Sequence, residues 1–113
     1  MKLYFVLVAP ARPANVGAAA RAMKTMGFDA MRLVASRVHE EEEASWVAHG
    51  AQEILTQAEA FDTLPEALAD MDLVIATTAR ERGRYQHYLT PGEIREQIRA
   101  KPSLGKVAIV FGC

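Results

Sequence analysis

The chain has 113 residues, of which 50% are hydrophobic and 24% are charged, a balance typical of one soluble globular domain. Its 13 basic and 14 acidic side chains give a net charge of -1, so any contact with nucleic acid must come from a local patch. The single cysteine, Cys113, cannot form an internal disulfide, and no apolar run approaches the ~18 residues of a membrane span. The N-terminus has no secretory-signal pattern, and we therefore expect a cytoplasmic protein.

Residues 3–28 predict a strand, a stiff loop and a helix, in that order. Residues 3–8 are apolar and rich in Val, Tyr and Phe, which favours a buried strand. Pro10 and Pro13 restrict the loop that follows, and this loop carries Arg12. Polar groups are thus expected at the carboxyl end of the strand, where open α/β sheets bind their ligands.

The helix after this loop has recognisable signals at both ends. Asn15 is expected to cap its start, and Gly27 to end it. Gly17, near the start, allows the backbone of a neighbour or a ligand to come close. Apolar side chains recur at helical spacing and predict a buried stripe, made of Val16, Ala19, Ala20, Met23 and Met26.

The next segments predict a second strand and an acidic helix. Residues 31–34 form a short apolar run suited to a strand. Residues 37–43 contain four consecutive glutamates, which suit the start of a solvent-exposed helix; the alternative, favoured for such a charge run, is a solvent-facing turn. The helix would continue to Gly50, with Trp46 and Val47 as its anchors into the core.

Residues 53–55 are expected to form another short strand. Thr63 and Glu66 then make a capping-box pattern, which predicts a helix reaching about residue 71. The side chains that this helix would bury are Leu64, Leu68 and Met71.

The last third of the chain repeats the alternation of strand and helix. Residues 73–77 are continuously apolar, as in a strand covered on both faces, and residues 106–111 form a similar strand. Between them lie a polar loop (78–89) and a capped helix (91–100). The alternation predicts a single α/β domain, Rossmann-like, with a parallel sheet and helices on both faces. Because a parallel strand normally leads into a crossover, we also expect further sequence beyond Cys113.

Basic side chains mark two places where chemistry is expected. Arg21 follows Gly17 by four residues and shares its helix face, which is suited to holding a phosphate or a developing oxyanion. The alternative is a surface arginine paired with a nearby acid. The second place is the loop beyond Thr77, where basic residues alternate with aromatic ones. Its arginines, with two basic residues of the first segment nearby, could form an RNA-binding patch; the alternative is an ordinary solvated loop. The residues of the patch would be Arg12, Lys24, Arg80, Arg82 and Arg84.

Several other sites find no support in the pattern. The three histidines are far apart and no cysteine pair exists, so no metal site is predicted. The first strand is not followed by a G-x-G-x-x-G or Walker A sequence, which leaves a generic nucleotide-binding domain without a supporting motif.

Four segments together resemble SPOUT-class RNA methyltransferases, in the TrmH-like branch that contains TrmJ and LasT. They are VAPARPANVGAAARAMKTMGF (8–28), WVAHGA (46–51), VIATTARERGRY (74–85) and VFG (110–112). The N-x-G-x-x-x-R spacing of Asn15, Gly17 and Arg21 resembles the first motif of that family. The resemblance covers essentially the whole chain.

This resemblance implies a homodimeric enzyme that transfers a methyl group from S-adenosylmethionine to a ribose 2′-hydroxyl of tRNA or rRNA. It implies catalytic roles for Arg21 and Asn15 and a C-terminal trefoil knot that builds the cofactor site. No metal is needed, because the sulfonium carries the leaving-group charge. The residues that the resemblance assigns to the cofactor are Thr77, Thr78, Ala79 and Gly112.

The match ends at Gly112, because the second motif continues beyond it in the family and the third motif is absent from these 113 residues. We therefore expect an N-terminal portion of a methyltransferase domain that binds S-adenosylmethionine weakly or not at all and does not turn over alone. The alternative function is a non-catalytic module that binds RNA or another partner through the arginine-rich loop (80–84).

Overall fold

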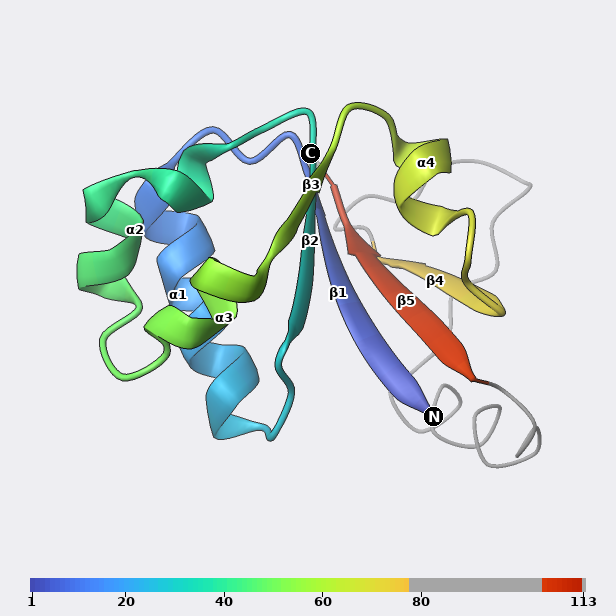
Figure 1. The fold of residues 1–113 in the computed structure, drawn as a ribbon, viewed down its shortest axis with the longest axis horizontal. Helices are drawn as coiled ribbons and strands as arrows, with labels where there is room; N and C mark the ends of the chain where they lie inside the picture. The colour runs from blue at the N-terminus through green and yellow to red at the C-terminus, as the bar shows by residue number, and fades with distance from the viewer. Residues whose placement is uncertain (78–104, 113) are drawn as a thin grey trace.

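A five-stranded parallel sheet forms the centre of the computed structural model, which describes residues 1–77 and 105–112. The strands are β1 (Lys2–Val8), β2 (Ala30–Val34), β3 (Glu59–Phe61), β4 (Leu73–Thr77) and β5 (Lys106–Phe111). Their order in space is β3-β2-β1-β5-β4, and every neighbouring pair is parallel (Figure 1). The predicted parallel α/β sheet is confirmed. The loop at 78–89 and the helix at 91–100 lie outside the described residues.

Helices cover both faces of this sheet, also as predicted. Three helices and a 3-10 turn lie on one face: α1 (Pro13–Thr25), η1 (Val38–Glu40), α2 (Glu42–Val47) and α3 (Gln52–Gln57). The short helix α4 (Leu64–Leu68) lies on the other face (Figure 1). Side chains alternate along β1 and β2, so that these two strands contribute to two separate hydrophobic clusters.

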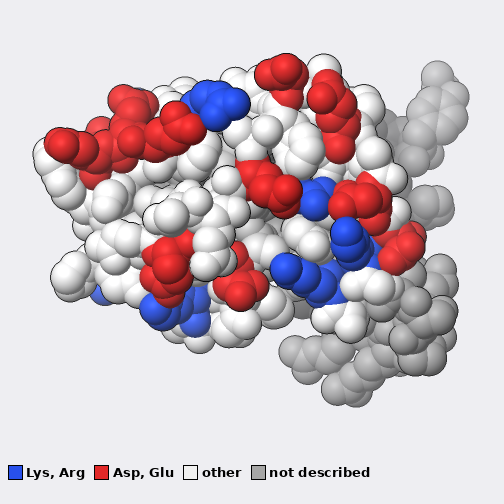
Figure 2. Space-filling model, viewed as in Figure 1, with Lys and Arg blue, Asp and Glu red and all other residues white. Residues whose placement is uncertain are grey.

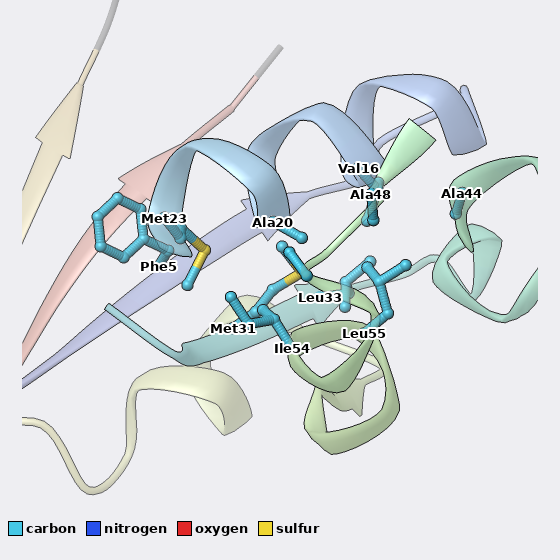
Figure 3. Packing of buried hydrophobic residues seen from close by; sticks show 11 residues of the cluster. Phe5, Val16, Ala20, Met23, Met31, Leu33, Ala44, Ala48, Ile54 and Leu55 are labelled. Carbon is cyan, nitrogen blue, oxygen red and sulfur yellow. The ribbon is translucent and has the colours of Figure 1, made fainter. Parts of the chain in front are cut away.

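The larger cluster joins the three-helix face to the sheet. Phe5, Met31 and Leu33 project from the strands towards α1 and α3 (Figure 3). They pack against an almost completely buried stripe of α1, which includes Val16, Ala20 and Met23. The predicted stripe is confirmed at these positions, but Met26 is 56% exposed because the helix already ends at Thr25.

Gly17 sets the distance between α1 and α2. A Cβ atom built on Gly17 would lie 2.3 Å from the carbonyl oxygen of Ala44 and 3.1 Å from the backbone nitrogen of Ala48. No side chain fits in that space, and Ala44 and Ala48 are themselves fully buried against α1. The predicted close approach at Gly17 is thus made by the backbone of α2.

The start of α1 differs from the prediction. Asn15 is not the N-cap residue, because Pro13 already occupies the first helical turn and Arg12 takes the cap position without a side-chain hydrogen bond. Proline suits the first turn, since its fixed φ is helical and its missing N–H needs no partner there. The end of the helix is as expected: Gly27 has a φ of +85°, and the N–H of Phe28 donates to the carbonyl of Met23.

The middle of the chain contains three further corrections. Trp46 is not an anchor, since it is 70% exposed and the small side chains of α2 are buried instead. Residues 53–55 lie within helix α3, where Ile54 and Leu55 enter the core. The strand β3 (Glu59–Phe61) was not predicted, because a three-residue strand carries too little periodicity.

The capping box is confirmed: the Thr63 hydroxyl accepts from the Glu66 N–H at 3.4 Å and donates to its carboxylate at 2.8 Å. The helix that it starts is shorter than predicted and ends at Leu68. Ala67 is its fully buried residue, while the expected Leu64, Leu68 and Met71 are only partly buried. The strand β4 is not covered on both faces, since it lies at the end of the described sheet and Val74 is 42% exposed.

Arg32 holds α4 to the sheet. This arginine is only 5% exposed and projects from β2 on the α4 side. Its guanidinium donates to both carboxylate oxygens of Asp70, at 2.7 and 3.1 Å, and to the carbonyl of Ala67 at 2.8 Å. It also donates to Glu59 at 3.1 Å and lies 4.5 Å from the ring centre of Tyr4. A buried charge is tolerated only with such partners, so Arg32 fixes where α4 and its following turn must lie.

Replacing Gly17 by alanine should destabilise the fold. In an exposed helix this change stabilises by about 1 kcal/mol, but here the added methyl group must displace the backbone of α2, at a cost of about 1–3 kcal/mol. The free energy of unfolding in urea measures the effect. Ala18→Ser, which adds one atom at the neighbouring exposed position, is the control and should change stability little. An unchanged or higher stability of Gly17→Ala would contradict the packing described.

Asp70 should make the fold sensitive to acid. Its hydrogen bonds from Arg32 and then from Lys106 hold the pKa of this carboxyl well below its usual range. Its contribution is therefore complete above the unfolded pKa of about 3.9 and is lost as the pH falls towards the folded value. We expect Asp70→Asn to lower the urea midpoint at pH 7 and to flatten the loss of stability below about pH 4.

The control for this experiment is Asp29→Asn, at an exposed aspartate whose side chain makes no hydrogen bond or ion pair in the described part of the chain. It should leave the acid dependence of the urea midpoint as in the parent chain. Parallel pH curves for Asp70→Asn and the parent chain would contradict the role of Asp70.

Candidate functional site

The carboxyl ends of all the strands lie along one edge of the sheet, because the strands are parallel. Two residues that end strands there, Ala9 and Ala35, adopt left-handed backbone conformations with φ of 49° and 56°. Their N–H groups continue the ladders by donating to Val34 and Phe61. Such conformations are costly for alanine and recur where a chain must turn sharply at a functional edge.

Two of the residues assigned to the cofactor meet at this edge. Thr77, the last residue of β4, lies opposite Phe111 in the ladder and is therefore close to Gly112. The Thr77 hydroxyl donates to the carbonyl of Val110 at 2.9 Å, which ties the end of β4 to β5. Thr78 and Ala79, the other two, lie outside the described residues. The described chain thus brings two of the four residues assigned to the cofactor close together.

Arg21 lies on a different part of the molecule, along the side of α1. It lines a shallow depression of about 180 Å³ together with Lys24 and Thr25 of α1 and the loop residues His49, Gly50 and Ala51. Its guanidinium has no hydrogen bond or ion pair to any described residue. Among the described residues, no acid is paired with this arginine.

Lys24, one turn further along α1, forms an ion pair with Glu53 of α3. This contact lowers the pKa of the Glu53 carboxyl. Lys24 is thus held by a carboxylate, whereas no residue in the described part of the chain pairs with the Arg21 guanidinium.

The remaining predicted residues do not join Arg21. Asn15 lies in the first turn of α1, two residues before Gly17, so it projects from a different side of the helix. Arg12 precedes the helix, roughly 13 Å along the axis from Arg21 at ~1.5 Å per residue. Arg80, Arg82 and Arg84 lie outside the described residues. Of the predicted basic residues that the structure describes, Lys24 lies with Arg21 on the side of α1, and Arg12 lies in the loop after β1.

His39 is a buried titratable residue for which no role was predicted. It is 8% exposed in the turn η1, and its Nδ1 atom has no hydrogen-bond partner in the described part of the chain. Burial lowers its pKa, so the neutral form is favoured at neutral pH. Its burial depends on the packing of η1 against α1, α2 and α3, which no local pattern reveals.

Among residues 1–77 and 105–112, no three His, Cys, Asp or Glu side chains gather in a way that could hold a metal ion. The same residues include no helix that is long and apolar enough to cross a membrane.

The sequence of this chain matches the sequence model of the SpoU rRNA methylase family over residues 2–113. The chain belongs to this family. As a SpoU family chain it has the expected α/β fold, and it superimposes on the crystal structure of TrmJ from Z. mobilis with a TM-score of 0.90. That comparison has 40% sequence identity and covers 99% of this chain and 50% of the other.

Two curated relatives define the likeness more closely. The protein named tRNA/rRNA methyltransferase LasT, from Escherichia coli K12, is 49% identical over 113 residues, which are 99% of this chain and 50% of LasT. The tRNA (cytidine/uridine-2′-O-)-methyltransferase TrmJ of Salmonella typhimurium is 40% identical over 107 residues, which are 95% of this chain and 44% of that enzyme. The chain spans about half the length of the curated relatives it matches.

Proposed function

We propose that this chain is the front part of an RNA ribose 2′-O-methyltransferase domain that uses S-adenosylmethionine. The observation that carries the proposal is the family match over residues 2–113, supported by relatives named as tRNA or rRNA methyltransferases. The substrate would be tRNA or rRNA, and the single cysteine of the chain suits a cytoplasmic enzyme.

Arg21 would act on the nucleophile. A ribose hydroxyl is a weak nucleophile and must lose its proton as it attacks the methyl carbon. An arginine stays protonated at neutral pH, so Arg21 is better suited to stabilise the forming alkoxide or to orient the adjacent phosphate. Its guanidinium lies beside the His49–Ala51 loop and has no partner among the described residues, which supports that role. Asn15, on another side of α1, would contact RNA elsewhere.

The cofactor would lie at the carboxyl edge, against the ends of β4 and β5. When bound there it supplies an activated methyl group. Thr77 and Gly112 lie next to each other at this edge, and in open α/β sheets ligands bind at this end of the strands. The fit of the described residues is partial, because the Thr77 hydroxyl is already bonded to Val110 and the assigned Thr78 and Ala79 are not described.

A homodimer would explain why Arg21 and the cofactor edge are apart within one chain. Arg21 lies on α1, which packs with α2 and α3, whereas Thr77 and Gly112 end the strands on the other side of β1. In a symmetric pair, Arg21 of one chain could approach the cofactor edge of the partner. The dimer is part of this proposal.

The cofactor proposal predicts a difference between two chain lengths. Isothermal calorimetry with S-adenosylmethionine should give weak or no binding to the 113 residues, because these supply one wall of the pocket. A chain extended to the length of its relatives should bind clearly. Micromolar binding to the 113-residue chain would contradict the incomplete pocket. No binding to the extended chain would contradict the proposed function.

Arg21→Ala in the extended chain tests catalysis. Losing one preorganised donor to a developing oxyanion costs about 10²–10³ in rate, so we expect methylation of tRNA or rRNA to fall by that factor while RNA affinity stays within a few-fold. Transfer of a radiolabelled methyl group and filter binding measure the two quantities. Lys2→Ala, at the opposite edge of the sheet, is the control and should change neither. An unchanged methylation rate in Arg21→Ala would contradict its catalytic role.

RNA binding without methylation in the parent extended chain would instead support the alternative function, a non-catalytic RNA-binding module. In that case Arg21→Ala would change affinity alone.

A further inference from the structure

A hollow lies beyond the ends of β2 and β3. It has a volume of about 450 Å³, and its lining residues are Ala35, Ser36, Arg37, Ala60, Phe61 and Asp62. None of these residues was predicted to take part in catalysis, cofactor binding or RNA binding. The volume lies within the ~300–1,000 Å³ range of small-molecule sites, which is large enough for a nucleoside.

The left-handed turn at Ala35 shapes this hollow. Because the N–H of Ala35 donates to the carbonyl of Phe61 at 2.8 Å, β2 stays paired with β3 up to the rim. The chain then turns at a φ of 56°, which leads Ser36 and Arg37 along the rim and away from the strand direction. A turn that is unfavourable for alanine is thus held in place by backbone pairing.

The lining offers a mixture of surfaces that is unusual for an anion site. Ala35, Ala60 and Phe61 are apolar residues, Arg37 is a donor and Asp62 is an acceptor. The Arg37 side chain is 69% exposed and pairs with Glu40 at 3.0 Å, in an exposed contact that contributes little and can be exchanged. A phosphate would be repelled by Asp62. A nucleobase, with an apolar face and both donors and acceptors on its edge, suits all three surfaces.

The hollow is joined to the edge where the reaction is proposed to occur. The Ser36 hydroxyl donates to the carbonyl of Pro10 at 2.9 Å and accepts from the N–H of Val38 at 3.3 Å. It therefore ties the rim to the loop that carries Arg12. The hollow and Gly112 lie along the same sheet edge, with the end of β1 between them.

Figure 2 shows carboxylates gathered over the region of α2 and the turn before it, where Glu40, Glu41, Glu42 and Glu43 are all exposed. RNA is repelled by that surface. An RNA strand that reaches the carboxyl edge is thus bounded on one side by these glutamates, next to the hollow.

We propose that the hollow beyond β2 and β3 binds the base of an unpaired nucleotide that flanks the methylated one. This inference rests on the proposed function, since it assumes that the ligand is RNA. It assigns Arg37 and Asp62 to the base edge and the apolar residues Ala35, Ala60 and Phe61 to the wall. Recognition by both a cation and a carboxylate separates it from general attraction to phosphate.

The test is an NMR titration of the ¹⁵N-labelled 113-residue chain with a short single-stranded RNA, and separately with free nucleosides and inorganic phosphate. RNA and nucleosides should shift the amide signals of residues 35–37 and 60–62, while phosphate alone should not. Arg37→Ala and Asp62→Ala should each raise the dissociation constant of the nucleoside, as fitted from these shifts, about fivefold. This is the loss expected for one hydrogen bond of ~1 kcal/mol. Lys2→Ala, a change of charge at the opposite edge, should leave them as in the parent chain.

Three outcomes would overturn the inference. Signals at 35–37 and 60–62 that stay unchanged with every ligand would show that the hollow binds no base. Shifts caused by phosphate alone would make it an anion site. Stronger RNA binding by Asp62→Ala, together with weaker binding by Arg37→Ala, would reduce the contact to charge attraction. Because methylation by the extended chain is measured separately, any of these results leaves the proposed function standing on its own test.

Discussion

The buried guanidinium of Arg32 is the interaction on which the α4 side of this fold depends. Removing a cation from water is expensive unless its hydrogen-bond donors are used, and here they reach β3, α4 and the turn after it. The carbonyl of Ala67 that accepts from Arg32 belongs to the last turn of α4, where a cation also interacts favourably with the helix dipole. Asp70 then binds Lys106 at 3.0 Å, which extends the same network to β5.

The opposite face depends on a steric constraint. Gly17 lets α2 approach α1 until the backbone of α2 is in contact with α1, and the buried alanines Ala44 and Ala48 fill the interface. This close contact also decides what remains outside: Trp46 faces solvent, and the loop from His49 to Ala51 is brought beside Arg21. The site on α1 is thus a consequence of helix packing. A glycine read as part of a catalytic motif has here a packing role that can be seen directly.

The loops that follow β1 and β2 are joined at the carboxyl edge of the sheet. There the chain leaves β1 and β2 through left-handed alanines, and the Ser36 hydroxyl joins the two loops. Arg12, Thr77, Gly112 and the hollow beyond β2 and β3 are distributed along this edge, whereas Arg21 is not. In the proposed enzyme, α1 and the strand ends would have to come together, as they could in a symmetric pair of chains.

The sequence by itself determined the parallel α/β fold class, the family and the strands β1, β2, β4 and β5, but not the three-residue strand β3. These follow from local signals: apolar runs, the Thr63 capping box, the stop at Gly27 and the spacing of Asn15, Gly17 and Arg21. Tertiary structure alone decided the rest. The side chains that pair with Arg32 lie 27 and 38 residues away from it, and the backbone that meets Gly17 belongs to another helix. Such contacts have no local pattern, because they arise only when burial brings distant segments together and makes each buried polar group find a partner.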